Sequence, residues 1–140
     1  MPYKLTAADG TTHGWCQWGE NISHRAEGKG DAPCTDGAIH YYATAEIAIF
    51  ADPIHGDYGE ESLLWEFKPE DILGTDGLKS WCKGGTTIKK IPKPIITLEQ
   101  RVEIAIRRVL LVYKEPGWVA WATGWLGGQR DVEAAGAAAR

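Results

Sequence analysis

The chain has 140 residues, of which 44% are hydrophobic and 24% charged, and this composition is typical of one globular domain. Fifteen Lys and Arg against nineteen Asp and Glu give a formal net charge of −4, which argues against a protein that binds duplex DNA through its phosphates. The sequence shows no apolar run near the roughly 20 residues of a membrane span and no signal-peptide pattern, so we expect a cytoplasmic protein without a membrane partner.

Alternating apolar and polar residues, bounded by Gly, Pro and Asp, predict strands in six segments. They are residues 3–7, 11–18, 37–43, 63–68, 78–83 and 86–91. Two pairs of these segments are predicted as hairpins, the first around Asp9-Gly10 and the second around Gly84-Gly85. In the third segment, His40 and Tyr42 share the face opposite Ile39, because side chains alternate along a strand.

Two other segments lie between these strands. Residues 20–36 contain few large apolar side chains and predict a long exposed loop, a feature that often serves as a binding loop. Thr44 is placed to cap a short helix over residues 45–51, and Asp52-Pro53 is expected to end that helix.

The C-terminal third predicts two helices. Residues 97–100, Thr-Leu-Glu-Gln, form a capping box that starts a helix running to about Tyr113. Pro116-Gly117 breaks this helix, and a second helix follows over residues 118–126. The second helix carries three Trp on one face, more apolar surface than one face normally buries, and this predicts a homo-oligomer.

These elements predict the α+β class. We expect a single domain over residues 1–130, with a mostly antiparallel sheet, one short internal helix and two C-terminal helices packed on one face of the sheet. An Ala-rich tail follows at residues 131–140.

The three cysteines and four histidines are dispersed along the chain. They form neither a C-x-x-C nor an H-x-x-x-H pair, so we expect no metal and no cofactor, and the thiols are expected to be reduced. A nucleophilic Cys paired with one of the His is an alternative, although isolated Cys usually act as small hydrophobes.

Charged and aromatic residues supply the candidate binding site. Residues 52–76 hold eight acids and one Lys, whereas residues 83–114 hold eight bases and two acids. Bases in the second segment can hold phosphate, and aromatic rings can stack on a nucleobase. The alternatives are a solvated dipolar surface and rings that fill the core. Seven residues are the candidates for ligand binding: His40, Tyr42, Trp15, Trp65, Trp81, Lys89 and Arg108.

Five segments carry a resemblance to a known group of proteins. They are Gly37-Ala-Ile-His-Tyr-Tyr-Ala-Thr-Ala-Glu-Ile-Ala48, Asp52-Pro-Ile-His55, Leu64-Trp-Glu66, Ile96-Thr-Leu-Glu-Gln-Arg-Val102 and the Trp-Ala-x-x-Trp-Leu pattern at 121–126. Over most of residues 3–130 the chain resembles small phage and prophage proteins. In topology it is also similar to ADP-ribosyltransferase-type folds, and this second likeness implies His40 and Glu66 as candidate members of a His-Tyr-Glu triad.

The resemblance implies a phage-encoded accessory protein in the host bacterial cytosol. We expect it to bind and sequester a small anionic ligand, a nucleotide or an ADP-ribose-type host immune signal, in a pocket lined by His40, Tyr42 and at least one of Trp15, Trp65 and Trp81. Missing P-loop, G-x-S-x-G and H-E-x-x-H motifs favour binding over catalysis. Two alternatives stay open: an ADP-ribosyltransferase-like enzyme acting on a host protein, and a protein-interaction inhibitor of a host defence complex that uses the Trp-bearing C-terminal helix.

Overall fold

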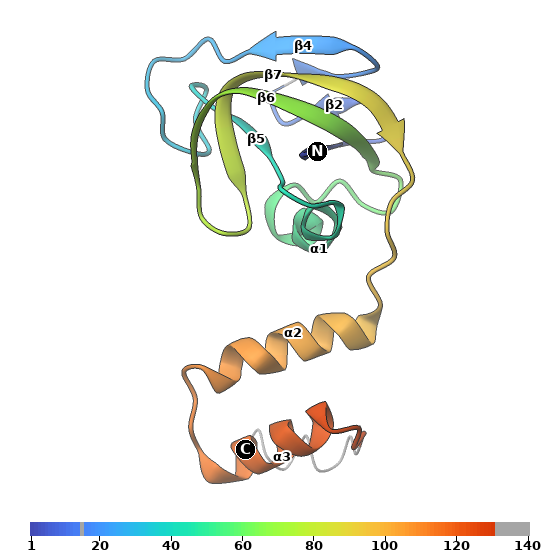
Figure 1. The fold of residues 1–140 in the computed structure, drawn as a ribbon, viewed down its shortest axis with the longest axis vertical. Helices are drawn as coiled ribbons and strands as arrows, with labels where there is room; N and C mark the ends of the chain where they lie inside the picture. The colour runs from blue at the N-terminus through green and yellow to red at the C-terminus, as the bar shows by residue number, and fades with distance from the viewer. Residues whose placement is uncertain (15, 131–140) are drawn as a thin grey trace. The chain divides into compact units, whose positions relative to one another are not determined.

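A computed structural model of the chain describes residues 1–14 and 16–130, and it divides into two compact units, Met1–Ile95 and Ile96–Arg140. The first unit holds an antiparallel sheet and one helix, and the second holds two helices (Figure 1). This combination confirms the α+β class. The predicted packing of the two C-terminal helices on the sheet stays a prediction, and the proposals for Trp15 and for the tail at 131–140 lie outside the described residues.

The first unit is built on a long hairpin of two strands. Its elements are β1 (Tyr3–Thr6), β2 (Thr11–Thr12), β3 (Cys16–Gln17), β4 (Ile22–Arg25), β5 (Ile39–Tyr41), α1 (Ala45–His55), β6 (Leu63–Thr75) and β7 (Ser80–Ile91). β6 pairs with β7, β1 pairs with the other edge of β6, and both β4 and β5 pair with the other edge of β7 (Figure 1). Tyr3 and Tyr42 exchange two backbone hydrogen bonds of 2.8 Å, which join the start of β1 to the residue after β5. This bridge brings β1 and β5 together at one end of the curved sheet.

The predicted hairpin around Gly84-Gly85 is wrong, because β7 runs without a break from Ser80 to Ile91. A Cβ atom added to Gly85 would lie 2.2 Å from Cζ of Phe67, so this glycine makes room for a ring and does not form a turn. The turn lies instead between β6 and β7, where the Asp76 carboxylate accepts hydrogen bonds from two backbone amides, those of Leu78 and Lys79 (2.9 and 2.7 Å). The Asp9-Gly10 turn is confirmed, with Gly10 at φ +85°, but β2 after it pairs with β3.

Two further boundaries differ from the prediction. α1 does not end at Asp52-Pro53 but continues to His55. Pro53 removes only one hydrogen bond of the helix, that of its own amide, and the Asp52 carbonyl still accepts from the Gly56 amide (3.0 Å). The predicted cap is confirmed, with the Thr44 side chain accepting from the Ile47 amide at 3.1 Å. Residues 20–36 are not all loop, because β4 lies within them and pairs with the edge of β7 through its backbone, which needs no apolar side chains.

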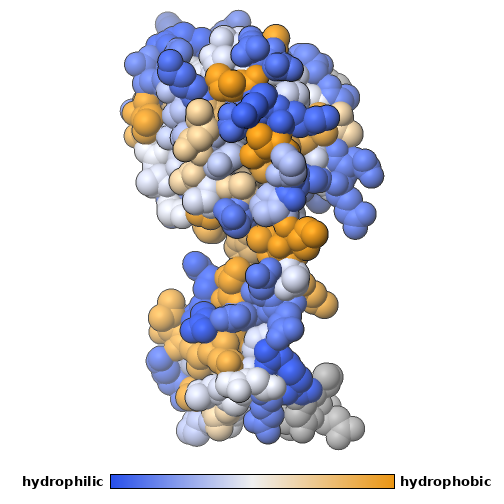
Figure 2. All heavy atoms as spheres, turned by 45° about the vertical axis from the view of Figure 1, so that its right-hand side comes forward, coloured by the Kyte–Doolittle hydropathy of each residue, from blue (hydrophilic) through white to orange (hydrophobic). Residues whose placement is uncertain are grey.

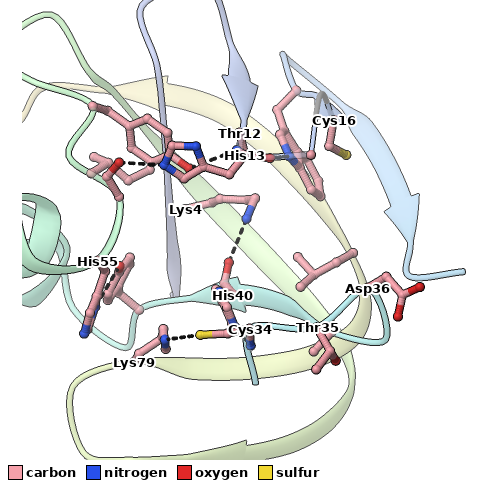
Figure 3. A pocket seen from close by; sticks show the side chains of 18 residues that line it. Lys4, Thr12, His13, Cys16, Cys34, Thr35, Asp36, His40, His55 and Lys79 are labelled. Atoms are coloured by element: carbon pink, nitrogen blue, oxygen red, sulfur yellow. Dashed lines mark hydrogen bonds between the residues drawn. The ribbon is translucent and has the colours of Figure 1, made fainter. Parts of the chain in front are cut away.

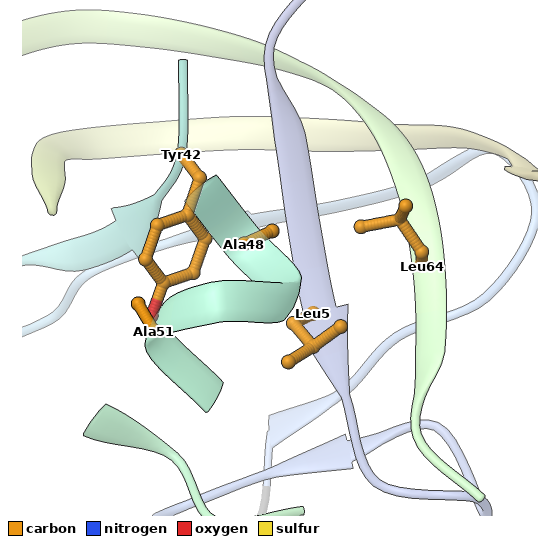
Figure 4. Close-up of a cluster of buried hydrophobic side chains, with 5 residues drawn as sticks. All are labelled: Leu5, Tyr42, Ala48, Ala51 and Leu64. Carbon is orange, nitrogen blue, oxygen red and sulfur yellow. The ribbon is translucent and has the colours of Figure 1, made fainter. Parts of the chain in front are cut away.

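Two clusters of buried side chains stabilise the first unit. One lies between α1 and the strands β1 and β6 (Figure 4), and the other lies across β6, β7 and the end of β5. The first comprises Leu5, Tyr42, Ala48, Ala51 and Leu64, and the second comprises Trp18, Tyr41, Phe67 and Cys82.

The second unit consists of α2 (Leu98–Leu110) and α3 (Pro116–Leu126). The predicted capping box is confirmed: Oγ1 of Thr97 accepts from the Gln100 amide (3.1 Å), and Oε1 of Gln100 accepts from the Thr97 amide (2.9 Å). α3 begins at Pro116 and not at residue 118, because the first helical position needs no amide proton from its residue. Figure 2 shows apolar surface on this unit, to which Leu98, Leu111, Val112 and Tyr113 contribute.

Candidate functional site

A cavity of about 520 Å³ opens in the first unit, within the size range of about 300–1,000 Å³ of small-molecule sites. Its walls come from parts of the chain that are distant in sequence (Figure 3). They are β1, residues 12–14 with Cys16 and Trp18, the loop at 34–38, β5 with Tyr42, the end of α1 with Tyr58, and the turn between β6 and β7. The cavity therefore forms only when the sheet and α1 are assembled.

Lys4 of β1 lines this cavity and is the most unusual residue in it. Lys4 is only 5% exposed, and its Nζ donates a hydrogen bond to the His40 carbonyl (2.7 Å). Nζ also lies 4.8 Å from the ring centroid of Trp18. Burial lowers the pKa of Lys4 from 10.5 to about 8, against a smaller opposite effect of Cys82 and Cys16. Among the described residues, none of the ion pairs includes Lys4, so its charge is buried without a carboxylate partner.

A second lysine stands at another wall of the cavity. Lys79 follows the turn between β6 and β7, and its Nζ lies 3.0 Å from Sγ of Cys34 (Figure 3). Cys34 has φ +60°, a left-handed backbone conformation that is uncommon for residues other than glycine. Asp36 is the one carboxylate among the described residues that line the cavity, against these two lysines. The lining is therefore positively charged on balance when both lysines are protonated.

His40 contacts Cys34 through the backbone and not through the thiol. Its Nε2 accepts a hydrogen bond from the Cys34 amide at 2.9 Å. Burial, together with the positive charges of Lys79 and Lys4, lowers the pKa of His40 to about 4. His40 is therefore a neutral ring at physiological pH, and the side chain that contacts the thiol is that of Lys79. This arrangement does not form the Cys–His pair of a thiol nucleophile at Cys34.

Two pairs of stacked rings line the side of the cavity near the end of α1. His13 lies against Tyr58, with ring centroids 5.1 Å apart and planes at 24°, and its Nε2 is 2.7 Å from the Gly56 carbonyl. Tyr42 and His55 are nearly parallel at 12°, and the Tyr42 hydroxyl lies 3.2 Å from Nδ1 of His55. Burial raises the pKa of Tyr42 and lowers that of His55, so both rings are favoured in their neutral forms. Tyr42 and His55 therefore add no net charge to this wall.

The loop that carries Cys34 is fixed to β7 by side chains. The indole of Trp81 donates to the Asp31 carbonyl (3.0 Å), and Nζ of Lys83 donates to the carbonyls of Gly28 and Gly30. Trp81 therefore holds the loop in place and does not itself line the cavity.

Of the six predicted ligand-binding residues that the structure describes, two line the cavity, His40 and Tyr42. Trp65 is buried and donates its indole N–H to Oγ1 of Thr6 (3.0 Å), outside the lining. Lys89 lies 3.7 Å from Glu66 on the surface of the sheet, and Arg108 is an exposed residue of α2 in the second unit. Among the described residues, the Trp that lines the cavity is Trp18. Whether any of these residues binds a ligand stays a prediction.

Sequence reasoning missed the two lysines of the cavity. Lys4 lies in an alternating strand segment, where a lysine normally indicates a solvent-facing position, and nothing near it in the sequence signals burial. Lys79 had a weak signal, because Thr75-Asp-Gly-Leu78 before it is a turn sequence and residues after a hairpin turn often lie at functional edges.

Comparisons of the chain with protein-family models, with curated proteins and with solved structures give no match. Within residues 1–14 and 16–130, no helix is long and apolar enough to cross a membrane. Over the same residues there is no group of three or more His, Cys, Asp or Glu placed to hold a metal ion. Fold and site together define an α+β protein with a ligand-sized cavity that contains a buried lysine.

Proposed function

We propose that the cavity binds a small anionic ligand of the nucleotide class. The observation that carries this proposal is Lys4, a buried ammonium group without a carboxylate partner. Removing a charge from water costs several kcal/mol unless another group compensates it. An ammonium group has three hydrogen-bond donors, and the His40 carbonyl accepts from one of them. A bound anion would supply the missing charge and accept from a second donor.

Lys79 supports the same proposal from another wall of the cavity. Its contact is a thiol, a weak acceptor that an anionic oxygen can replace at little cost. Two lysines against one lining carboxylate suit a ligand with at least one negative charge, such as a phosphate. The Tyr42–His55 and His13–Tyr58 ring pairs line the same cavity, and aromatic side chains stack on nucleobases.

The position of Glu66 weakens the enzyme alternative. An ADP-ribosyltransferase-like site needs Glu66 and His40 to converge, but Glu66 is not among the residues that line the cavity and lies 3.7 Å from Lys89. Binding without catalysis is therefore favoured. That the ligand is ADP-ribose or another host immune signal, and that the protein sequesters it, are further parts of the proposal, motivated by the resemblance to phage proteins.

Calorimetric titration with AMP, ADP-ribose and uncharged adenosine tests this function. We expect the two anions to bind and adenosine to bind at least about 10-fold more weakly, because a charge-assisted hydrogen bond contributes about 1.5–3 kcal/mol. Lys79→Met should weaken AMP binding by about 10- to 100-fold. Lys89→Met is the matched control, since it removes a lysine outside the cavity, and it should leave the affinity unchanged. Failure of both anions to bind, or equal binding of adenosine, would overturn the proposal.

A further inference from the structure

The surroundings of the Lys4 amine are those of a reactive lysine as well as of an anion-binding one. Nζ lines the cavity, its hydrogen-bond acceptor is a neutral carbonyl, and the rings of Trp18 and Phe67 lie at 4.8 and 5.7 Å. The titratable groups that act on it are the thiols of Cys16 and Cys82 and the ring of His40. These are weak acids or a neutral ring, so within the described part of the chain no carboxylate is paired with Lys4 to hold its proton at neutral pH.

This environment increases the fraction of Lys4 side chains that carry the neutral, nucleophilic amine at a given pH. With a pKa of about 8 for Lys4, half of the molecules carry the neutral amine at pH 8. An ordinary lysine is neutral in only about 0.3% of molecules at that pH, roughly 100-fold less. A desolvated lysine in a cavity is one of the standard ways in which a protein activates an amine as a nucleophile.

We infer that Lys4 captures its ligand covalently and reversibly, as an imine with an aldehyde or ketone group on a small anion. This inference rests on the proposed anion-binding function and narrows the class of ligand to anions that carry a carbonyl group. Lys79 holds the negative end of the ligand, while the carbonyl carbon lies against Nζ of Lys4.

The chemistry needs no oxidant or cofactor. The lone pair of the Lys4 amine forms a bond to the carbonyl carbon, and the carbonyl oxygen takes up a proton to give a carbinolamine. The nitrogen then loses its proton, the hydroxyl group leaves as water after protonation, and the C=N bond forms. One amine and one carbonyl thus give one imine and one water. The two protons that leave the amine nitrogen are the two that the carbonyl oxygen takes up, so the step is balanced without any other group.

Reductive trapping tests this inference. The protein is incubated with glyoxylate, a small anionic aldehyde, and sodium cyanoborohydride at pH 8, and carboxymethyl-lysine is located by peptide mapping. We expect Lys4 to be trapped at least about 10-fold faster than Lys89 and Lys90, two exposed lysines of the same chain that serve as internal controls. The ratio should fall between pH 8 and 10, because ordinary lysines gain neutral amine over that range. AMP should slow the trapping of Lys4 and leave that of Lys90 unchanged.

The possible outcomes distinguish the imine from the proposed anion-binding function. Trapping at Lys4 and at the exposed lysines is compared within the wild-type protein, so the test does not depend on the folding of a variant. Equal trapping of Lys4 and the exposed lysines overturns the imine. If AMP still binds by calorimetry, the anion-binding function survives that result. If Lys4 is trapped selectively but AMP does not bind, the imine stands and the nucleotide class is wrong. If neither occurs, both proposals are wrong.

Discussion

Replacing Lys4 by Met tests how much the buried charge costs the folded protein. The substitution keeps most of the apolar volume and removes the ammonium group. Because burial lowers the pKa of Lys4 from 10.5 to about 8, the protonated side chain destabilises the folded state at neutral pH, by about 3 kcal/mol at about 1.4 kcal/mol per pKa unit. The lost hydrogen bond to the His40 carbonyl offsets about 1 kcal/mol of this. We therefore expect Lys4→Met to raise the free energy of unfolding by about 2 kcal/mol at pH 7.

The pH dependence of this effect has a definite sign. Between pH 8 and 10.5 the unfolded chain binds more protons at Lys4 than the folded chain does, so the wild type gains stability relative to the variant as the pH rises. The advantage of Lys4→Met should therefore be full below pH 8, fall as the pH rises, and reverse above pH 10.5, where only the loss of about 1 kcal/mol from the missing hydrogen bond remains. Burial raises the pKa of Cys16 and Cys82, which destabilises both proteins at alkaline pH. Only the difference between the two proteins isolates Lys4.

Urea unfolding followed by tryptophan fluorescence at pH 7, 8, 9 and 10 measures this difference. Lys89→Met is the control, and its effect on the free energy of unfolding should not follow the same pH profile. The reasoning is refuted if Lys4→Met destabilises the protein at pH 7 by more than about 1 kcal/mol, or if the difference from wild type stays constant up to pH 10. The expected result would mean that the fold tolerates a destabilising lysine at its cavity, as binding sites often do.

Four further predictions follow from other contacts. On lowering the pH from 6.5 to 4.5, His40→Gln should lose less stability than the wild type. Burial lowers the pKa of His40 from 6.5 to about 4, so in this range the unfolded wild type binds a proton that the folded wild type does not. An equal fall of the urea midpoint in both proteins between these two pH values would contradict this. Trp81→Phe removes the hydrogen bond to the Asp31 carbonyl and should cost about 1 kcal/mol and speed amide exchange across residues 26–38, whereas unchanged exchange would exclude the anchoring role. Thr97→Ala should cost the second unit about 0.5–2 kcal/mol and reduce amide protection at the start of α2, with Thr97→Ser as the control that retains the hydroxyl. Because α3 carries three Trp, we expect the protein to be a dimer, with the mass of two chains measured by light scattering. The mass of a monomer at micromolar concentration would contradict this prediction.

The features that sequence reasoning predicted correctly depend on neighbouring residues. The caps at Thr44 and Thr97 and the turn at Asp9-Gly10 are all present in the structure. The i,i+4 ion pair of Glu103 and Arg107 on α2, with its atoms 2.9 Å apart, is a local contact of the same kind. A hydroxyl three residues before an amide, or a glycine after an aspartate, acts within a few bonds of itself, so its effect does not depend on the rest of the fold.

The two main errors have different causes, one a contact with a distant residue and the other a helix that continues past a proline. Gly84-Gly85 resembles a turn locally, but Gly85 is needed because the Phe67 ring of the neighbouring strand occupies the space of a side chain. Pro53 resembles a helix end, but the Asp52 carbonyl supports one more turn. At Gly85 a tertiary contact overrides the local signal, whereas at Pro53 the helix continues through a hydrogen bond between residues four apart.

By itself, the sequence determined the α+β class, the starts of α1 and α2, and the presence of His40 and Tyr42 on one candidate strand. Only the tertiary structure decided where the site is and what charge it carries. Lys4, Lys79 and the end of α1 are separated by tens of residues, and they share a cavity because β1 pairs with β6 while the turn after β6 reaches the loop of Cys34. Strand pairing and the burial of a single amine depend on contacts between distant segments, and no spacing along the chain records those contacts.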